Sequence, residues 1–530
     1  MMRPSPGAGP TRGVVVAAAI ALAWLACGAQ ERVATPSEPG NGQHSDLWGQ
    51  KGELWTPTSR LPDVAYAGYE RGEQAIPSPA VVANVRDFGA RGDGAADDTQ
   101  AFQAAIRATA QGAILVPAGR YTITDFVTID KPNLVLRGEG RDRTVLWFPR
   151  TLTDVKPNWG ATTTGQRTSN YSWSGGYLVL SGSFNQQTLA SIVGTARRGD
   201  TWLPVSTVAG ISVGQWVDVR VTDDEARSLT TWLYNDDPGS LSEMSAQTAR
   251  QVARVDAVDL AGGRIRIDRP LRFETRPAFS PVVRSFRPTV TGSGFEDMTL
   301  EFPQTPWQGE FSELGYNGVS VGTAAHCFVR RLRLVNAESG IFVSGVHNTI
   351  EDVELLATKP PYTANKYLTT AGCNGHHGIS VGGSDNLVMR FDLRMSYVHD
   401  LSVEGGGSAG NVFSAGRADD MAFDHHKKAP HGNVFTDIDA GAGNRIWRCG
   451  GGADLGRQSG GWETFWNIRA AKALGYPPAG WGPGSMSLVG FTTASASTKE
   501  PSGVWFEAID PASLAPANLH AAQLARRLGR

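Results

Sequence analysis

The chain has 530 residues, a formal net charge of −2 and 19% charged residues. This length exceeds one ordinary core and predicts two or three structural units, while the near-neutral charge excludes the basic field typical of nucleic-acid-binding proteins. Glycine is abundant, with 63 residues, but it is not periodic, so a collagen-like chain is excluded. Short Val, Ile and Leu runs between these glycines predict many strands joined by turns.

The first 27 residues have the pattern of an export signal. Arg3 and Arg12 precede an apolar stretch at 14–26, which is short for a membrane span and typical of a signal peptide. The stretch ends in LAWLAC, which resembles a bacterial lipoprotein signal with Cys27 as the lipidated residue. We expect an exported protein that is either a cell-surface or periplasmic lipoprotein, touching the membrane only through this anchor, or simply secreted.

A composition change near residue 81 marks the start of the predicted fold. Residues 28–80 are rich in Pro, Gly, Ser and Gln, which predicts a tether. The next segment, VRDFGARGDGAADDTQAFQAAIRATA, contains Asp97 and Asp98 as turn and cap residues before apolar residues at helical spacing. Short predicted strands follow in AILVP, YTITD, NLVLRG and TVLWFP, separated by turn residues.

The run from Val85 to Leu146 resembles the N-terminal signature of the pectate-lyase-like right-handed β-helices, the superfamily with rhamnogalacturonase and epimerase-like members. The resemblance implies an all-β fold, a single-stranded right-handed parallel β-helix, whose N-terminal part we assign to 81–149. It does not imply one reaction, because the superfamily contains lyases, hydrolases, epimerases and phage tailspikes.

The middle of the chain interrupts the β-helix pattern. Within 150–290, GDTWLPVSTVAGISVGQWVDVRVTD and ARVDAVDLAGGRIRIDRPLRF alternate apolar and polar residues with period two. This alternation predicts an inserted antiparallel β subdomain. The insertion either forms one wall of a substrate cleft or is a structural elaboration.

Strand-like triplets resume and extend over 291–470, the predicted main β-helix. Asn386, Asn411 and Asn433 each open an apolar triplet at intervals of 25 and 22 residues, which is typical of a solenoid of parallel strands. The remaining residues, 471–530, end in PANLHAAQLARRLG, an amphipathic pattern that predicts a helix capping the open end of the stack.

The densest group of titratable residues, RADDMAFDHHKKAPHGN, lies at 417–433. DLSVE from Asp400 to Glu404 and DMAFD from Asp420 to Asp424 share one pattern, offset by twenty residues. If the coils align on this pattern, Asp400 stacks on Asp420 and Glu404 on Asp424, about 4.8 Å apart and facing solvent. Carboxylates so close require a raised pKa, a cation or a basic partner.

These residues predict a catalytic site with two alternative mechanisms. In a lyase, His425, His426 or Lys427 is the base. In a hydrolase, Asp420 pairs with Asp400 or Asp424 across the glycosidic bond. Oxygen ligands from Asp420, Asp424 and Glu404 also suit Ca²⁺, and the sequence indicates no other cofactor. The predicted substrate-binding residues are Arg445, Arg448, His376, His377, His431 and Trp447.

We therefore expect a polysaccharide as the partner, acidic because cationic side chains surround the acids, and cleavage by β-elimination rather than hydrolysis. A glycoside hydrolase and a non-catalytic glycan-binding β-helix are the alternatives. Apart from Cys27, the chain has only Cys327, Cys373 and Cys449, which form either one disulfide or three buried thiols.

Overall fold

The computed structural model describes residues 42–162, 164–363, 372–498 and 503–530. The predicted signal peptide, Cys27 and the first part of the predicted tether lie outside the described residues. None of the helices in the described ranges is both long enough and apolar enough to cross a membrane.

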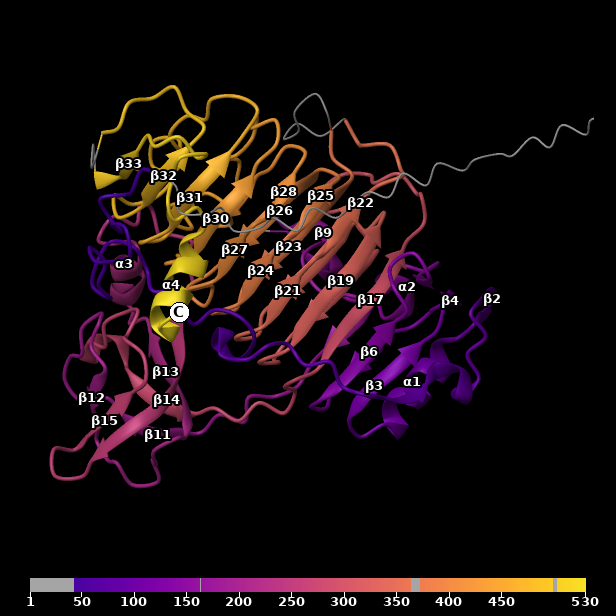
Figure 1. Ribbon diagram of the computed structural model, residues 1–530, viewed down its shortest axis with the longest axis horizontal. Coiled ribbons are helices and arrows are strands. Elements are labelled where there is room, and N and C mark those ends of the chain that lie inside the picture. The colour runs from indigo at the N-terminus through magenta and orange to yellow at the C-terminus, as the bar shows by residue number, and fades with distance from the viewer. Residues whose placement is uncertain (1–41, 163, 364–371, 499–502) are drawn as a thin grey trace, which may run out of the picture. The chain divides into compact units, whose positions relative to one another are not determined.

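Parallel strands wound into coils form the body of the molecule (Figure 1). One seven-stranded sheet consists of β5 (Val127–Ile129), β10 (Leu178–Leu180), β18 (Asn317–Val321), β20 (Ser339–Val343), β23 (Gly375–Val381), β26 (Tyr397–Val403) and β29 (Phe423–His425). Neighbours in this sheet pair in parallel, as in β20 with β23 and β23 with β26. The expected single-stranded right-handed β-helix is confirmed.

The remaining strands of the coils form one 18-stranded sheet. Long strands such as β17 pair with two shorter strands of a neighbouring coil, β6 and β7, so the sheet covers two sides of the β-helix. Its members are β1 (Val81–Asn84), β2 (Asp93–Asp97), β3 (Gly112–Val116), β4 (Gly119–Thr122), β6 (Leu134–Gly138), β7 (Thr144–Trp147), β17 (Gly294–Glu301), β19 (Phe328–Val335), β21 (Thr349–Glu351), β22 (Glu354–Leu356), β24 (Leu387–Met389), β25 (Asp392–Arg394), β27 (Val412–Ser414), β28 (Arg417–Ala418), β30 (Val434–Asp439), β31 (Thr464–Arg469), β32 (Ser487–Phe491) and β33 (Trp505–Glu507).

A ladder of buried asparagines fixes the register of successive coils. The Oδ1 atom of Asn411 accepts hydrogen bonds from the backbone N–H and the Nδ2 of Asn386, at 2.9 and 3.1 Å. Asn433 accepts the same two bonds from Asn411, and Asn386 accepts them from Asn348. The asparagine spacing in the sequence therefore predicted the coils correctly. At the next coil Glu463 replaces asparagine and accepts a bond from Asn433 Nδ2 at 2.7 Å.

Helix α1 (Thr99–Ala108) covers the N-terminal end of the coils (Figure 1). Its apolar residues Phe102, Ala105 and Ile106 are buried in the main core. The carboxylate of Asp98 accepts the backbone N–H groups of Arg91 and Gly92, which confirms a turn-forming role for this acid. The other short elements before and after it are η1 (Tyr69–Gly72), η2 (Val85–Phe88), α2 (Leu152–Val155), β8 (Trp159–Ala161), β9 (Arg167–Ser169) and η3 (Asn170–Ser172).

The inserted subdomain is an antiparallel six-stranded sheet with its own hydrophobic core. It begins later than the predicted residue 150, because β10 still belongs to the β-helix. Its elements are β11 (Thr188–Ser191), β12 (Trp202–Pro204), β13 (Trp216–Thr222), α3 (Ser228–Leu233), β14 (Thr248–Asp259), β15 (Arg264–Ile267), η4 (Pro277–Phe279) and β16 (Val282–Ser285).

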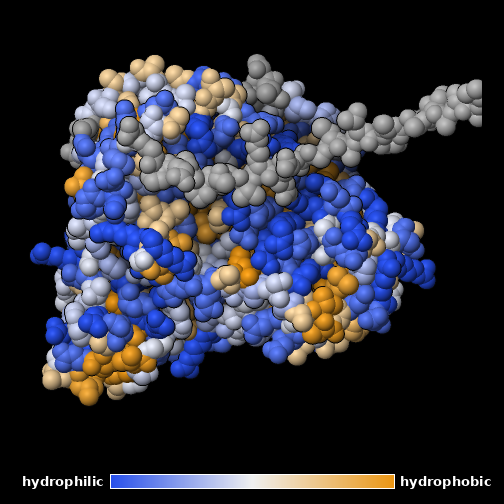
Figure 2. Space-filling view, viewed as in Figure 1, coloured by the Kyte–Doolittle hydropathy of each residue, from blue (hydrophilic) through white to orange (hydrophobic). Residues whose placement is uncertain are grey.

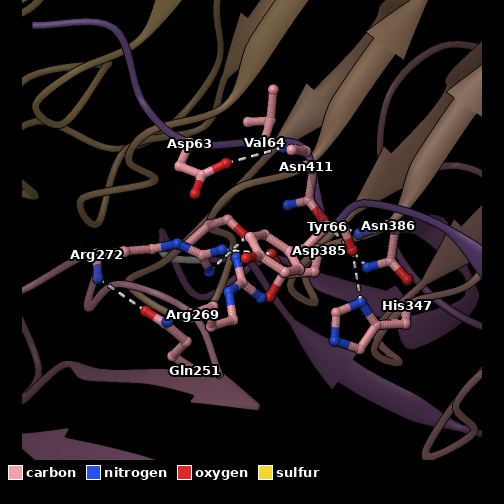
Figure 3. A network of polar contacts seen from close by, with 12 residues as sticks. Asp63, Val64, Tyr66, Gln251, Arg269, Arg272, His347, Asp385, Asn386 and Asn411 are labelled. Atoms are coloured by element: carbon pink, nitrogen blue, oxygen red, sulfur yellow. Dashed lines mark hydrogen bonds and ion pairs between the residues drawn. The ribbon is translucent and has the colours of Figure 1, made fainter. Parts of the chain in front are cut away.

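A buried ionic network joins this subdomain to the coils (Figure 3). Arg269 and Arg272 follow β15, and both guanidinium groups donate to the carboxylate of Asp385 in the coils. Burial opposes ionisation of Asp385, but the two arginines outweigh it and hold the pKa of this carboxyl well below its usual range. Removal of the acid would leave two buried positive charges, so the network fixes the subdomain in place.

The expectation of a free tether is wrong for residues 42–80. Trp48, Leu61 and Val64 are buried against the coils, and their neighbours include Leu514 and Leu519. This segment, residues 42–76, is called the strap below. Its backbone pairs with the C-terminal region, since Gln43 N–H donates to Ser513 at 2.8 Å. Apolar side chains in a Pro- and Gly-rich segment therefore bind it to the surface of the β-helix.

The C-terminal prediction is also corrected. Strands β32 and β33 continue the parallel sheet beyond residue 470, so the coils extend further than expected. Helix α4 (Leu519–Leu528) does not cover the open end. Its first residue, Leu519, donates its N–H to Thr436 Oγ1 in β30, and the helix packs beside the strap. The amphipathic face of α4 thus covers a side of the coils.

Hydrophobic side chains gather on part of the inserted subdomain and near the N-terminal end of the coils in the view of Figure 2. Exposed large hydrophobic residues of these segments include Val213 and Leu260 in the insertion and Val81 and Val82 in β1. The rest of this face is largely hydrophilic (Figure 2).

Candidate functional site

Four histidines converge beside strands β23, β26 and β29, and we name them the histidine cluster: His376, His377, His399 and His426. Neighbouring rings lie 4.2 to 5.0 Å apart between His376 and His377, His377 and His399, and His399 and His426. The first three side chains are almost completely buried, whereas that of His426 is 27% exposed. The cluster therefore has one edge that solvent reaches.

Strand register explains how Asp424 reaches the cluster. Leu401 and Phe423 align in neighbouring strands and belong to the core, while Ser402 aligns with Asp424 on the opposite face. Asp424 Oδ2 accepts bonds from Ser402 Oγ at 2.9 Å and His426 Nδ1 at 3.0 Å, and lies 3.2 Å from His399 Nδ1. Its Oδ1 accepts the Gly450 N–H at 2.7 Å. One buried carboxylate thus orients two imidazoles.

The electrostatics of the cluster follow from burial and from these carboxylates. Burial opposes the charge of Asp424, but His399 and His426 outweigh it and hold the pKa of Asp424 well below its usual value. Burial also disfavours a charged His426, yet Asp424 prevails and raises the pKa of His426. In contrast, burial lowers the pKa of His377 far below its usual value, and the neighbouring imidazole of His376 adds to this effect.

A loop between β17 and β18 supplies two further acids. Glu313 Oε1 lies 3.1 Å from His376 Nδ1 and accepts a bond from Trp307 Nε1 at 3.0 Å. Glu310 Oε1 lies 3.9 Å from the Nε2 atoms of both His376 and His399. The sequence prediction missed both acids, because they are distant in the chain from every other member. A signal for His399 did exist, since it lies one coil of 22 residues after His377.

The predicted role of His425 as a base is corrected. His425 aligns with the core residue Val403, and its ring packs against Phe435 and Trp481. Its Nε2 lies 3.3 Å from Oε2 of the equally buried Glu463. Because side chains of a strand alternate between faces, His425 points into the coils while its neighbours Asp424 and His426 point out.

The predicted stack of acids is also wrong. The coils align with an offset of 22 residues rather than 20, so Asp424 stacks on Ser402 and not on Glu404. Asp400 instead accepts Arg445 Nη2 at 2.6 Å and the Ala422 N–H at 2.8 Å. The irregular segment between β28 and β29 adds the two residues that shift the register.

The other two acids of the predicted calcium set have separate partners. Asp420 accepts the Asn444 N–H at 2.7 Å, and Glu404 pairs with Lys428 at 2.7 Å. Among the described residues, groups of three metal-binding side chains form only in the histidine cluster and with Asp424. The oxygen-rich site expected from Asp420, Asp424 and Glu404 is therefore not assembled.

Of the predicted substrate-binding residues, three are structural. Arg445 is buried, with bonds to Tyr397 O and Asp400. Trp447 donates to Gly475 O and packs on Phe465. His431 is buried, and burial lowers its pKa to about 3.

By contrast, His376 and His377 are members of the cluster, and Arg448 and Lys427 lie at its edge. Arg448 is half-buried, and Glu310 is among the acids that act on its charge. Lys427 follows His426 directly and packs at Gly451. The described cysteines Cys327, Cys373 and Cys449 are free thiols.

Comparison with known proteins places one segment of the chain in a family. Residues 82–164 match the family Rhamnogalacturonase A/epimerase, pectate lyase-like. The resemblance expected from Val85 to Leu146 is therefore confirmed.

Two curated relatives come from Azotobacter vinelandii. Mannuronan C5-epimerase AlgE3 is 37% identical over 109 residues, covering 19% of this chain and 6% of that protein. Alginate lyase 7 is 42% identical over 72 residues, covering 12% of this chain and 8% of that protein. The chain thus spans less than a tenth of the length of these relatives.

Solved structures align over most of the chain at low similarity. The A-module of mannuronan C-5 epimerase AlgE4 from Azotobacter vinelandii gives a TM-score of 0.32 and 13% identity, covering 80% of each chain. An alginate lyase from Paenibacillus sp. str. FPU-7 gives a TM-score of 0.36 and 8% identity, covering 81% of this chain and 98% of the other. The architecture of this chain rests on its own strand pairing.

Proposed function

We propose that the chain is an exported enzyme that cleaves an acidic polysaccharide by β-elimination, with the histidine cluster as its active site. The relatives of its N-terminal segment include an alginate lyase and mannuronan epimerases, names that both denote chemistry on polymers of uronic acids. β-Elimination and C5 epimerisation of a uronate begin with the same step, removal of the proton next to the carboxylate. Such a step needs a positioned base and positive charge near the carboxylate.

The hydrogen-bonded pair of His426 and Asp424 carries this proposal. Asp424 accepts the His426 Nδ1–H at 3.0 Å, which fixes the ring and leaves Nε2 to accept a proton. The partial exposure of His426 allows contact with a polymer at the surface, unlike the other members of the cluster. His426 is therefore assigned as the base and Asp424 as the residue that positions it.

Positive side chains at the same edge suit a uronate carboxylate. Arg448 has a buried Nη1 without a hydrogen-bond partner among the described residues. Lys427 directly follows the base, and Lys428 is held by Glu404. A guanidinium nitrogen with no acceptor gains a charge-assisted hydrogen bond when a carboxylate binds. We assign Arg448 and Lys427 to binding of the substrate carboxylate.

A hydrolase mechanism has less support. It requires two carboxylates on either side of the glycosidic bond. Asp400 is paired with Arg445, and Asp424 is surrounded by imidazoles and backbone donors. Neither is presented to a sugar as one of a matched pair.

The test is turnover on polymannuronate, polyguluronate, pectate and neutral glycans in deuterated water. β-Elimination gives a product with an ultraviolet-absorbing double bond and new chain ends. Deuterium at C5 without chain cleavage would instead indicate epimerisation, and reducing ends without the double bond would indicate hydrolysis. Binding without any of these changes on the whole panel would overturn the enzyme proposal.

A further inference from the structure

The buried part of the histidine cluster has the arrangement of a metal site. One ligand atom from each of His376, His377 and His399 lies within 4.8 Å of the other two. Zinc–nitrogen bonds of about 2.0–2.1 Å place two ligand atoms about 3–4 Å apart, so small side-chain rotations bring all three into range. His377 Nδ1 is buried and has no hydrogen-bond partner among the described residues, which is costly unless a ligand satisfies it.

Two carboxylates behind the imidazoles define which nitrogens face inward. Glu313 lies 3.1 Å from His376 Nδ1, and Asp424 lies 3.2 Å from His399 Nδ1. A proton on each Nδ1 is stabilised by its carboxylate, which leaves Nε2 of both rings with a free lone pair. Carboxylates in this position orient metal-binding histidines and increase their basicity.

Glu310 completes the set with an oxygen. Its Oε1 lies 3.9 Å from Nε2 of His376 and 3.9 Å from Nε2 of His399, the two nitrogens that the carboxylates leave free. One carboxylate oxygen is thus equidistant from two imidazole lone pairs. Three imidazoles and one carboxylate are ligands that suit zinc, iron and related ions, whereas calcium and magnesium prefer all-oxygen sites.

We propose that His376, His377, His399 and Glu310 bind one divalent transition-metal ion. Glu313 and Asp424 act as the outer partners of His376 and His399. The assignment goes beyond the proposed function and does not depend on it, because metal occupancy is measured without substrate. If β-elimination is also correct, the ion adds positive charge next to His426, where a uronate carboxylate would bind.

The test uses protein produced without a polyhistidine tag, freed of metal by chelation and titrated separately with Zn²⁺ and Co²⁺. We expect about one ion per chain, with cobalt giving visible absorption bands of a low-coordinate nitrogen and oxygen site. The double variant His376→Gln/His399→Gln should lose this binding. Glu313→Gln keeps all four ligands and should weaken affinity by about 10- to 100-fold through the outer carboxylate.

His431→Gln is the matched control, because His431 is equally buried but lies outside the cluster. It should bind metal like the unmodified chain. Circular dichroism of each variant verifies that the coils remain folded, and Glu310→Gln, at a position with 12% side-chain exposure, provides a milder second variant. Equal binding by the double variant and the unmodified chain would overturn the proposal, as would no binding of either ion by the unmodified chain.

Discussion

Strand β29 and the residue after it present the same chemistry to two different environments. Asp424 and His426 lie on the outer face, at the edge of the histidine cluster, whereas His425 between them lies inside the coils. Inside, His425 meets one acid, Glu463, which also ends the asparagine ladder. Outside, Asp424 serves two imidazoles, and further imidazole nitrogens have no protein partner among the described residues.

The difference shows which buried polar residues stabilise the fold and which are available for chemistry. The inner pair completes a ladder and packs among aromatic rings, so its role is structural. The outer group keeps lone pairs that the fold does not use. Three adjacent residues, identical in character in the sequence, therefore have two functions that only the strand direction separates.

Substitution of the outer residue should have the largest effect. His426→Gln keeps a polar side chain but removes the base, so turnover should fall by about 10²- to 10⁴-fold. Stability should change little because the side chain is partly exposed. Rates of double-bond formation on the best substrate of the panel, together with thermal unfolding, measure both effects. His44→Gln, at an exposed site far along the chain, is the control, and equal rates in all three proteins would refute the assignment of the base.

Substitution of the inner residue should give the opposite result. His425→Phe fits the aromatic surroundings but leaves Glu463 buried without its partner, so the free energy of unfolding should fall by about 3–5 kcal/mol. Turnover per folded molecule should be retained. Urea denaturation and active-site titration separate the two quantities.

A second substitution sharpens this test. Adding Glu463→Asn to His425→Phe removes the unpaired acid and extends the ladder with the residue type found at Asn433. The double variant should therefore be more stable than His425→Phe alone. If it were less stable, the inner pair would not be the reason for the loss.

The ladder itself should contribute a smaller amount. Asn411→Ala leaves the backbone N–H of Asn386 buried without an acceptor, which should cost about 1–3 kcal/mol. Urea denaturation beside Asn444→Ala, at an exposed position, gives the comparison. Similar losses in both variants would mean that the ladder sets register without adding stability.

Histidines away from both faces should produce the smallest effect, a loss of stability in mild acid. Burial lowers the pKa of His326 and of His520 to about 4, below the unfolded value near 6.5. The unfolded chain therefore takes up protons first as the pH falls, and stability present above pH 6.5 is lost progressively down to pH 4. Each histidine should contribute about 0.7 kcal/mol between pH 7 and pH 6.

The measurement for these histidines is the free energy of unfolding as a function of pH. His520→Gln should make the dependence shallower by the share of one histidine. An unchanged pH dependence would show that His520 does not stay neutral in the folded chain.

Much of the fold was predictable, because a solenoid repeats its signals. The asparagines at 386, 411 and 433 revealed the coils, and the period-two segments revealed the insertion. The site was predictable only in part. The DHH sequence was recognised, but a register error of two residues paired the wrong acids and placed His425 on the outer face.

The remaining members of the site depend on tertiary structure. Glu310 and Glu313 come from a loop that precedes His376 by more than sixty residues, and no local pattern marks them. The packing of the strap was missed for a similar reason. Its Trp48, Leu61 and Val64 are too widely spaced to give a periodic signal, and their partners lie near the other end of the sequence.

The strap also changes how the molecule should come apart. In a plain solenoid each coil contacts only its neighbours, so the terminal coils can detach first and the rest follow one at a time. Here Gln43 is bonded to Ser513 and Ala515, Val64 to Gln523, and Gly68 to the backbone of Asp385 in the middle coils. Loss of the last coils would also release the strap from the middle ones. The two ends of the chain thus behave as one clasp, which resists peeling and makes disassembly a single concerted event.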